Sequence, residues 1–422
     1  ITEIVSKDLP QIDLLIGGSS CFKEGTLILT DKGYKNIEDI VSGDMVLTHT
    51  NTYKKVVSPM INKSSNIYTI ETMCSEKIET TSEHPFYVRK KYREWDNTQR
   101  RQIRKFSNPT WVNAEDLTKD YYVGYSINKN SIIPEWNGSK VIVNTDSSKL
   151  VNTISEKLVL ENFWWFVGNY MGDGWCSIGK RKNRKNSHSY IVQLCCNKKD
   201  LNIIKNKIEG LFDYSLKETR TTYNFFIYSQ ELVEFLEQFG KYSHGKKLNN
   251  SILDLPINLL KSFLEGYFKA DGYDNGIKIR VSSVSRDLIY GISQCIQKVY
   301  NRPVSITKIQ TADKHCIEGR VVNQRDYYTA TFKKEKGKQD KSFYENGYCW
   351  YPINKIDNDI YESIVYNMEV EDDNSYTANG VIVHNCQDFS IAGKQKGMVT
   401  KEQLPVLSLE QYLDLKNNDF EF

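Results

Sequence analysis

Residues 21–49 read CFKEGTLILTDKGYKNIEDIVSGDMVLTH. Short runs of apolar and β-branched residues alternate in this stretch with turn-forming glycine, asparagine and aspartate. The same pattern continues in 67–72 (IYTIET) and 83–90 (EHPFYVRK), and it returns much later in 349–356 (CWYPINKI) and 375–385 (SYTANGVIVHN). The sequence therefore predicts one mostly-β domain whose two parts are far apart along the chain.

The intervening sequence has a different character. A polar stretch over 129–150 is typical of a linker, and the apolar run ENFWWFVGNYMGDG at 161–174 then predicts a helix. Strand-like runs follow within the same region, for example SYIVQLCC at 189–196 and YYTATF at 327–332. These patterns predict an α+β domain inserted into a surface loop of the β domain, where an insertion costs little stability.

Composition excludes several classes of protein. The 422 residues carry a net charge of +3, and the mean hydropathy of -0.54 leaves no apolar run long enough to cross a bilayer. The first residues lack the pattern of a secretory signal, so we expect a cytoplasmic protein with no membrane partner. Nine cysteines without paired C-x-x-C spacing favour neither a disulfide framework nor a zinc site.

Three stretches of the β domain resemble the conserved blocks of inteins. Residues 21–49 resemble the opening block, TTSEHPF at 80–86 the block with Thr-x-x-His, and VYNMEVEDDNSYTANGVIVHNC at 365–386 the closing blocks. The resemblance implies a Hint (hedgehog/intein) fold, mostly β, and an autocatalytic reaction that excises residues 21–385. The host polypeptide in cis would be its substrate, and no cofactor would be needed.

The residues at the two junctions suit that chemistry. The thiol of Cys21 can attack the carbonyl of Ser20 to give a thioester, because thiols are good nucleophiles. Cys386 can then take over the upstream segment, and cyclisation of Asn385 frees the intein. A sulfur-to-nitrogen acyl shift joins Ser20 to Cys386 by a normal peptide bond.

The resemblance also implies the roles of three further residues. Thr81 and His84 would hold and polarise the upstream scissile amide, with His84 giving a proton to the departing nitrogen, and His384 would assist asparagine cyclisation. Two positions depart from the family pattern, since Asn367 stands where many inteins have aspartate and Asn374 where many have histidine. We therefore expect slower splicing or a heavier reliance on the two histidines.

Two segments of the inserted domain share a second pattern, FVGNYMGDG at 166–174 and LEGYFKADG at 264–272. Small residues spaced i, i+4 allow two helix backbones to approach closely, which would bring Asp173 and Asp271 together. Adjacent carboxylates repel, so a hard cation such as Mg²⁺ is expected between them.

The inserted region, roughly 155–340, resembles the LAGLIDADG homing endonucleases. That resemblance implies a monomeric hydrolase that cuts double-stranded DNA, with Asp173 and Asp271 as metal-binding catalytic residues. A lysine often assists in this family, and Lys247 fits the spacing somewhat better than Lys246. A basic loop is expected to contact DNA phosphates through Lys180, Arg181, Lys182, Arg184 and Lys185.

The flanking residues resemble a third family. Joined together, DLLIGGSS and CQDFSIAGKQKGM resemble the catalytic cysteine motif of DNA cytosine-5 methyltransferases, in which Cys386 would attack a flipped-out cytosine. S-adenosylmethionine would serve only the complete, spliced host. The predicted organisation is host fragment 1–20, splicing domain 21–135, endonuclease 150–342, splicing domain 343–385 and host fragment 386–422.

Two other interpretations remain open. A hedgehog-type autocleaving domain shares the β fold and the cysteine chemistry, although His384 and Asn385 followed by Cys386 disfavour it. The chain could also be a methyltransferase fragment that carries an inactive endonuclease. The products discriminate between these interpretations, because splicing joins the flanks whereas autocleavage leaves them separate.

Overall fold

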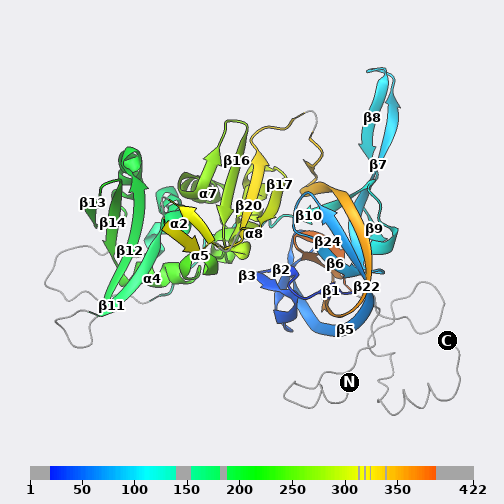
Figure 1. The fold of residues 1–422 in the computed structure, drawn as a ribbon, viewed down its shortest axis with the longest axis horizontal. Coiled ribbons are helices and arrows are strands. Elements are labelled where there is room, and N and C mark those ends of the chain that lie inside the picture. The colour runs from blue at the N-terminus through cyan, green and yellow to red at the C-terminus, as the bar shows by residue number, and fades with distance from the viewer. Residues whose placement is uncertain are drawn as a thin grey trace, which may run out of the picture. The chain divides into compact units, whose positions relative to one another are not determined.

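The computed structural model describes residues 20–138, 154–180, 188–311, 314–317, 320–323, 325–337 and 340–385. Within it, Ser19–Asn385 forms one compact unit (Figure 1). No helix in these ranges is both long and apolar enough to span a membrane.

A fourteen-stranded sheet system combines the two ends of that unit. Its strands before the insertion are β1 (Phe22–Lys23), β2 (Leu27–Thr30), β3 (Gly33–Asn36), β4 (Met45–Leu47), β5 (Tyr53–Thr72), β6 (Ile78–Thr81), β7 (Pro85–Asp96), β8 (Arg101–Phe106), β9 (Thr110–Asn113) and β10 (Tyr121–Ser126). After the insertion come β21 (Phe343–Glu345), β22 (Tyr348–Val370), β23 (Ser375–Ala378) and β24 (Val381–His384). Short 3-10 turns lie at Ile37–Asp39 and Ala114–Asp116. The prediction of one β domain built from both parts of the sequence is confirmed.

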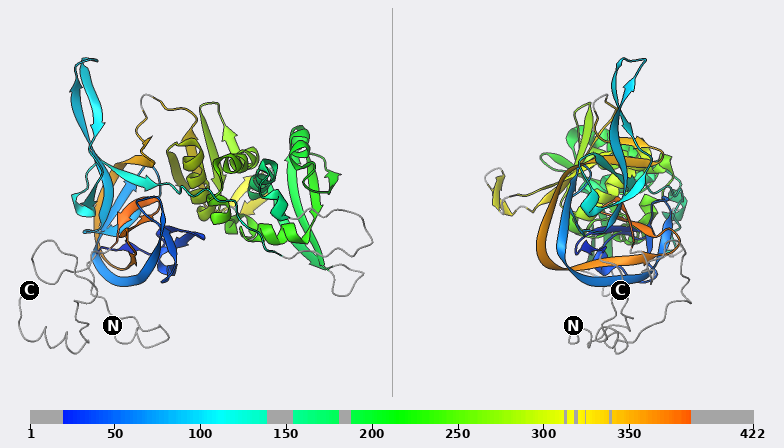
Figure 2. Two further views of the ribbon diagram at one scale, coloured as in Figure 1. Left: turned by 180° about the vertical axis from the view of Figure 1, so that it is seen from behind. Right: turned by 90° about the vertical axis from the view of Figure 1, so that its right-hand side faces the viewer.

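The long antiparallel pair of β5 and β22 forms the frame of this domain (Figure 2). Three register irregularities along the pair bend the strands, as β-bulges do. The short β1 lies between β22 and β6, with Phe22 opposite both Tyr366 and Thr80. This pairing places Cys21, the residue before β1, inside the sheet system rather than at its rim.

The inserted region is α+β, as expected. Its helices are α1 (Ile154–Lys157), α2 (Glu161–Asp173), α3 (Leu201–Ile208), α4 (Gln230–Glu237), α5 (Tyr242–Gly245), α6 (Asn250–Leu253), α7 (Ile257–Asp271) and α8 (Arg286–Tyr300), with a 3-10 turn at Lys198–Asp200. Its strands are β11 (Trp175–Lys180), β12 (His188–Asn197), β13 (Tyr214–Glu218), β14 (Thr222–Tyr228), β15 (Gly272–Asp274), β16 (Lys278–Ser283), β17 (Val304–Ile309), β18 (Lys314–Ile317), β19 (Arg320–Asn323) and β20 (Tyr327–Lys333).

The strands of the insertion repeat one arrangement. After α2 the order is β11-β12-β14-β13, and after α7 it is β15-β16-β20-β17. In both sheets the strand that comes last in the sequence lies between the second strand and the third. In both halves a helix, α3 or α8, separates the first two strands from the later ones along the chain. The internal pseudo-repeat inferred from the two motifs is therefore present in the fold, with the pair β18 and β19 as an addition to the second half.

The first part of the expected linker packs against the insertion. The side-chain amide of Asn128 donates to the carboxylate of Asp254 at 2.6 Å, and the backbone N–H of Ile132 donates to the carbonyl of Asp254 at 2.7 Å. Elsewhere Arg286, at the start of α8, pairs with Glu76 and donates to the carbonyl of Gly25. Polar contacts of this kind hold the inserted region to the β domain.

Candidate splicing and endonuclease sites

Helices α2 and α7 of the insertion approach each other through glycine. A Cβ added at Gly168 would lie 1.9 Å from the carbonyl oxygen of Phe263, and one added at Gly266 would lie 2.0 Å from that of Trp165. Real Cβ atoms do not approach so closely, so any larger residue would force the helices apart. The close approach predicted from the spacing of small residues is present.

Asp173 and Asp271 end these two helices. Burial, together with the charge of Asp173, raises the pKa of Asp271 to about 6, and burial raises the pKa of Asp173. The described residues contain no group of three or more His, Cys, Asp or Glu side chains placed to hold a metal. Two carboxylates nevertheless fit Mg²⁺, which usually takes one or two carboxylates and completes its shell with water and substrate phosphate oxygens.

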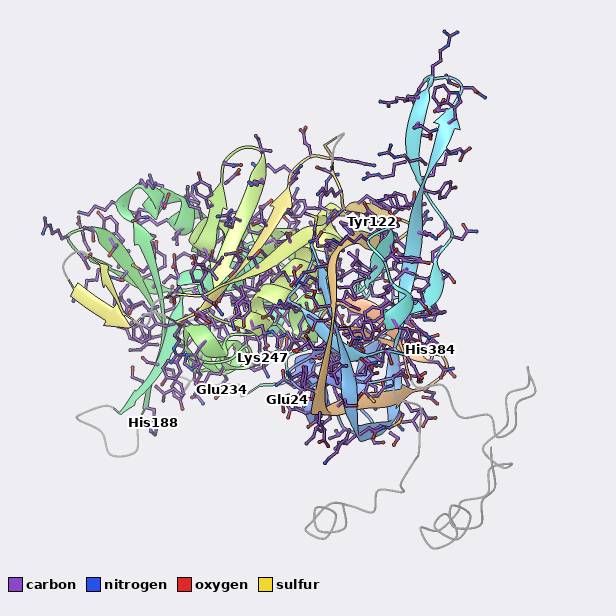
Figure 3. All side chains as sticks on the ribbon, turned by 45° about the vertical axis from the view of Figure 1, so that its right-hand side comes forward. Glu24, Tyr122, His188, Glu234, Lys247 and His384 are labelled. Atoms are coloured by element: carbon purple, nitrogen blue, oxygen red, sulfur yellow. The ribbon has the colours of Figure 1, made fainter. Side chains whose placement is uncertain are left out.

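Lys246 lies beside this pair. Its Nζ donates to the carbonyl oxygens of Tyr170, Met171 and Gly174 at 2.9, 3.0 and 2.9 Å, and it caps the end of α2 in this way. Burial lowers the pKa of Lys246 to about 8, and the nearby charges of Asp271 and Asp173 limit that fall. Lys247, the residue favoured by spacing, is exposed (Figure 3). The structure thus brings Lys246 rather than Lys247 to the aspartates.

The predicted DNA-binding loop falls mostly outside the described residues. Lys180 ends β11, and Arg181, Lys182, Arg184 and Lys185 lie in the gap that follows.

The peptide bond between Ser20 and Cys21 is buried and held at both of its polar atoms. The N–H of Cys21 donates to the hydroxyl oxygen of Thr81 at 2.8 Å, and the side-chain amide of Asn367 donates to the carbonyl oxygen of Ser20. Ser20, Cys21, Thr81 and Asn367 are each less than a tenth exposed. An amide held in this way is aligned and polarised at its carbonyl, as attack by the Cys21 thiol requires.

Asn367 is itself fixed by two neighbours. Its side-chain oxygen accepts hydrogen bonds from the N–H of Met368 and the hydroxyl of Tyr376, both at 2.7 Å. The side-chain nitrogen must then face Ser20. Asn367, which is neutral where the resemblance implies an aspartate, therefore donates a hydrogen bond to the Ser20 carbonyl.

His84 is fully buried beside this peptide, and its ring centroid lies 4.1 Å from that of Phe22, with the two rings tilted at 57°. Burial lowers the pKa of His84 to about 3, although the backbone of Ser20 and of His384 partly opposes the shift. Neither ring nitrogen has a hydrogen-bond partner of normal geometry among the described residues. At neutral pH the ring is therefore neutral and can exchange a proton with groups formed at the Ser20 carbon.

The downstream junction lies where Asn374, just before β23, meets Asn385, just after β24. The side-chain amide of Asn385 donates to the side-chain oxygen of Asn374 at 3.2 Å, and its backbone N–H donates to the Asn374 carbonyl at 2.9 Å. The Nδ1 of His384 lies 3.0 Å from the carbonyl oxygen of Asn385. Burial lowers the pKa of His384, whose ring packs edge-on against Trp111.

The two junctions meet in space. Val383 of β24 pairs with Phe86 of β7, two residues beyond His84, and the backbone and charge of His384 both affect the pKa of His84. Five of the six splicing residues expected from the sequence, namely Cys21, Thr81, His84, His384 and Asn385, thus lie at these two junctions. The described residues end at Asn385, so the position of Cys386 is not described.

A family comparison agrees with this geometry. The family model described as the intein splicing domain matches residues 27–385. The chain belongs to this intein family. Because the match spans the inserted region, both parts of the β domain belong to one splicing element.

Curated relatives of this intein match it at low identity. An uncharacterized protein of Methanocaldococcus jannaschii is 25% identical over 413 residues, which cover 88% of this chain and 51% of that protein. The ATP-dependent DNA helicase Hel308 of Thermococcus kodakarensis is 24% identical over 454 residues, which cover 93% of this chain and 39% of the helicase. The intein chain thus spans about half or less of the length of these relatives.

Solved structures also resemble parts of the intein. The homing endonuclease I-DmoI in complex with DNA and calcium is 14% identical, and the match covers 41% of this chain and 82% of that one with a TM-score of 0.30. The bacterial intein-like domain from Clostridium thermocellum is 23% identical, with 25% and 67% coverage and a TM-score of 0.20.

The structure gives two residues of the intein contacts that the sequence did not indicate. Asn367 and Asn374, the two departures from the family pattern, each make a direct hydrogen bond to a junction residue. A signal was available for Asn374, because asparagine tolerates the left-handed backbone conformation found there, with φ of 48°. No comparable local signal marks Asn367, whose contact with Ser20 joins residues 347 positions apart.

Proposed function

We propose that the chain excises residues 21–385 from a host polypeptide and joins Ser20 to Cys386. The observation that carries this proposal is the pair of hydrogen bonds to the Ser20–Cys21 peptide, one from Asn367 to its carbonyl and one from its N–H to Thr81. Hydrogen bonds at both polar atoms of this buried peptide would align it and polarise its carbonyl for attack by the Cys21 thiol. The splicing domain in this proposal comprises residues 21–135 and 343–385, and it needs no cofactor.

Each step can be assigned to groups near the junctions. The Cys21 sulfur forms a bond to the Ser20 carbon while its thiol proton passes to the neutral ring of His84 and Asn367 stabilises the developing oxyanion. His84 then gives that proton to the Cys21 nitrogen as the amide bond breaks. Cys386 then accepts the Ser20 acyl group from the Cys21 thioester. Asn374 orients the amide nitrogen of Asn385 for attack on its own carbonyl, which His384 polarises. The acyl shift to nitrogen completes the new peptide bond.

Intact mass measurement of the purified chain tests this reaction. After incubation at neutral pH the unaltered chain should give a free intein of residues 21–385 and a joined peptide of residues 1–20 and 386–422. The matched Cys21→Ala, Asn385→Ala chain should stay whole. Cleavage without a joined product would favour a hedgehog-type autocleaving domain, and an unaltered chain that remains whole would refute both mechanisms.

We further propose that the insertion, residues 150–342, is a site-specific endonuclease that cuts both strands of DNA. This function is supported by Asp173 and Asp271, which end two helices packed through glycine and which have raised pKa values. These two residues would hold Mg²⁺, which when bound supplies Lewis-acid activation of a phosphate. Lys246 is better placed than Lys247 to assist, and the basic loop from Lys180 would contact phosphates.

A duplex that carries the joined host coding sequence, codon 20 followed by codon 386, is the substrate to test. Cleavage in the presence of Mg²⁺ should be lost in Asp173→Asn and Asp271→Asn, whereas Lys247→Met should cleave at the parent rate. If Lys247→Met is inactive and Lys246→Met is active, the assignment of the lysine is wrong. If no variant differs from the parent, the insertion is not the nuclease.

The flanks support a further proposal about the host, a cytoplasmic DNA cytosine-5 methyltransferase. This rests on the motif in which Ser20 is joined to Cys386, outside the described residues except for Ser20. In the complete spliced host, S-adenosylmethionine would provide the methyl group. Transfer of a radiolabelled methyl group to cytosine in DNA by a complete host made without residues 21–385, lost in Cys386→Ala of that host, is the result expected.

A further inference from the structure

The hairpin of β7 and β8 in the splicing domain contributes no residue to the proposed splicing reaction. Up to Lys90, β7 pairs with β9 and β10 within the sheet system. From Lys91 onward its partner is β8, in a regular register that ends with Asp96 opposite Arg101. The segment is a two-stranded ribbon that projects from the domain (Figure 1).

This ribbon is strongly basic. Residues 85–106 contain two acidic side chains, Glu94 and Asp96, against eight basic ones, namely Arg89, Lys90, Lys91, Arg93, Arg100, Arg101, Arg104 and Lys105. The whole chain has a net charge of only +3, so the positive charge is concentrated in this segment. Such concentration is typical of surfaces that bind polyanions.

The register divides the charges unequally between the two faces. Directly opposed residues of an antiparallel pair share a face. One face, which we name the basic face, carries Arg93 opposite Arg104, Trp95 opposite Gln102, and Lys91 opposite Phe106. The other face carries both acidic residues, with Lys105 opposite Tyr92 and Arg101 opposite Asp96. The acidic residues of the hairpin are therefore all on one face.

The basic face is unfavourable for the hairpin itself. Like charges placed directly opposite each other destabilise a strand pair, and Arg93 lies directly opposite Arg104. Beside them the large apolar side chain of Trp95 is 55% exposed. A polyanion bound on this face would neutralise the arginine pair and cover the exposed tryptophan.

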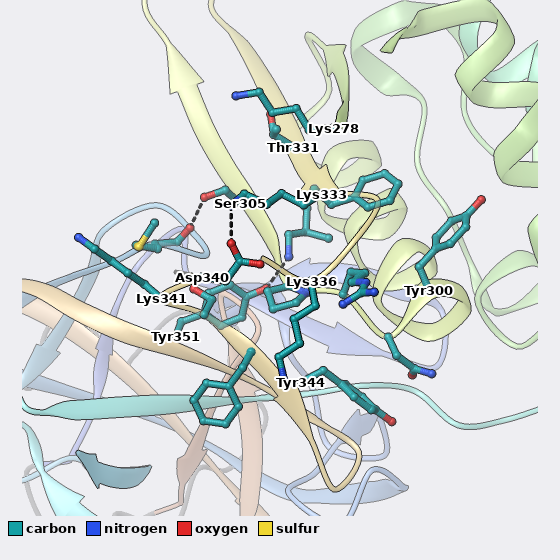
Figure 4. Close-up of a pocket in the computed structure, with 18 of the residues that line it drawn as sticks. Lys278, Tyr300, Ser305, Thr331, Lys333, Lys336, Asp340, Lys341, Tyr344 and Tyr351 are labelled. Atoms are coloured by element: carbon teal, nitrogen blue, oxygen red, sulfur yellow. Dashed lines mark hydrogen bonds and ion pairs between the residues drawn. The ribbon is translucent and has the colours of Figure 1, made fainter. Parts of the chain in front are cut away.

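Positive charge continues from this face toward the base of the insertion. Arg104 donates to the backbone carbonyl of Asp340 at 2.9 Å. Asp340 lines a cavity of about 690 Å³ whose wall also carries Lys278, Arg302, Lys333, Lys336 and Lys341 (Figure 4). Only one of these cations, Lys333, is paired with Asp340. The ribbon and the cavity wall thus offer an extended positive surface suited to a long ligand.

We propose that the basic face of the β7–β8 ribbon binds double-stranded DNA and extends the DNA contact of the intein beyond its inserted domain. Arg93 and Arg104 bind backbone phosphates, and Trp95 packs against the sugars or the groove wall. A two-stranded ribbon has dimensions that the major groove admits. The choice of DNA as the polyanion rests on the proposed endonuclease function.

The test compares two faces of one hairpin. Arg93→Gln with Arg104→Gln removes two charges from the basic face, and Arg101→Gln with Lys105→Gln removes the same charge from the other face. Both pairs are made in the full chain with Cys21→Ala and Asn385→Ala, which keep it whole. Binding to a fluorescently labelled duplex of mixed sequence is followed by anisotropy from about 50 to 200 mM salt.

Loss of two phosphate contacts should reduce the steepness of the plot of log K against log salt by about 1.8. If the plots of parent and variant meet near 1 M salt, this difference weakens binding roughly 60-fold at 0.1 M salt. The basic-face pair should show this loss, and the other pair should stay within about threefold of the parent chain. Removing the opposed arginines relieves repulsion but also removes the hydrogen bond from Arg104 to Asp340, so the melting temperature should change little. An unchanged melting temperature excludes misfolding as the cause of weaker binding.

Equal weakening by the two pairs would overturn the inference, because the ribbon would then act only through its total charge. If the parent chain binds and cleaves DNA and the Arg93→Gln, Arg104→Gln variant binds DNA as tightly as the parent, DNA binding by the ribbon is refuted and the proposed endonuclease function is not. The converse result, face-selective loss of binding in a chain that does not cleave, would support the ribbon without the nuclease. A parent chain that binds no duplex would refute the ribbon.

Discussion

The sharpest prediction concerns the amide of Asn367, which donates to the carbonyl that the Cys21 thiol attacks. Replacing Asn367 with alanine removes this donor while the thiol and Thr81 remain. The side chain is 2% exposed and Ser20 is 7% exposed, so water cannot readily take the place of the lost amide. The oxyanion that forms at the Ser20 carbon would then lose one fully buried hydrogen bond.

The expected loss is large because such donors act in a water-excluded site. Removal of one oxyanion donor typically costs about 10²–10³ in rate, or about 2.7–4 kcal/mol. The first step can be isolated in a chain with Asn385→Ala and Cys386→Ala, in which thioester formation is read from cleavage by an external thiol. Release of residues 1–20, followed by mass spectrometry, should slow by that factor in Asn367→Ala.

Tyr376→Phe is the matched control, since it removes a contact that orients Asn367 but leaves the amide donor in place. Its rate should fall by less than about tenfold, the equivalent of one ordinary hydrogen bond. If Asn367→Ala cleaves within about threefold of its parent, the carbonyl contact is not catalytic and the reasoning fails. Equal losses in the two variants would instead make packing around Asn367 the cause.

Three further predictions concern stability. The pKa of Asp271 is raised to about 6 in the folded chain from the ordinary 3.8, so the unfolding free energy should fall as pH rises between these values. Asp271→Asn should therefore raise it by about 1–2 kcal/mol at neutral pH in urea unfolding, and Mg²⁺ should raise the melting temperature of the parent only. The pKa of His84 is lowered to about 3 from 6.5, so its contribution is fully present above pH 6.5 and is lost as pH falls toward 3. His84→Gln should show a shallower decline between pH of about 7 and 4, and an equal decline would contradict the assignment. Gly266→Ala should cost about 1–3 kcal/mol because its Cβ meets the facing backbone at 2.0 Å, whereas Gly179→Ala, with open space around it, should change stability by less than about 0.5 kcal/mol in the same unfolding assay.

The parts of the fold that could be predicted are those fixed by local chemistry. Gly168 and Gly266 marked the helix crossing because only a residue without Cβ permits backbone contact there. The β character of both flanks followed from turns and alternation, and their union followed from the resemblance at the junctions. Cys21, His84 and Asn385 could be named as candidates because they stand at the positions of the intein motifs that the sequence resembles.

The remaining features depend on tertiary contacts. Lys246 and Lys247 are adjacent and identical in type, so only the path of the backbone after α5 decides which ammonium group turns toward the aspartates. The basic face of the ribbon is equally hidden, since charges alternate along YVRKKYREWD and the faces separate only once the register with β8 is known. Asn367 could not be assigned because β22 and Ser20 meet only in the folded chain.

The splicing site works with neutral groups, and burial explains why. Charged residues are costly in an environment where Cys21 is 2% exposed and His84 is fully buried. The lowered pKa of His84 keeps its imidazole neutral, and Asn367 provides an amide dipole where the resemblance to inteins implies an aspartate. A carboxylate in that position would face the Ser20 carbonyl with an oxygen and would have to be protonated before it could donate. The amide of Asn367 donates a hydrogen bond at every pH. The pH range over which this intein forms its thioester should therefore be set by the titration of His84 and not by that of a carboxylic acid.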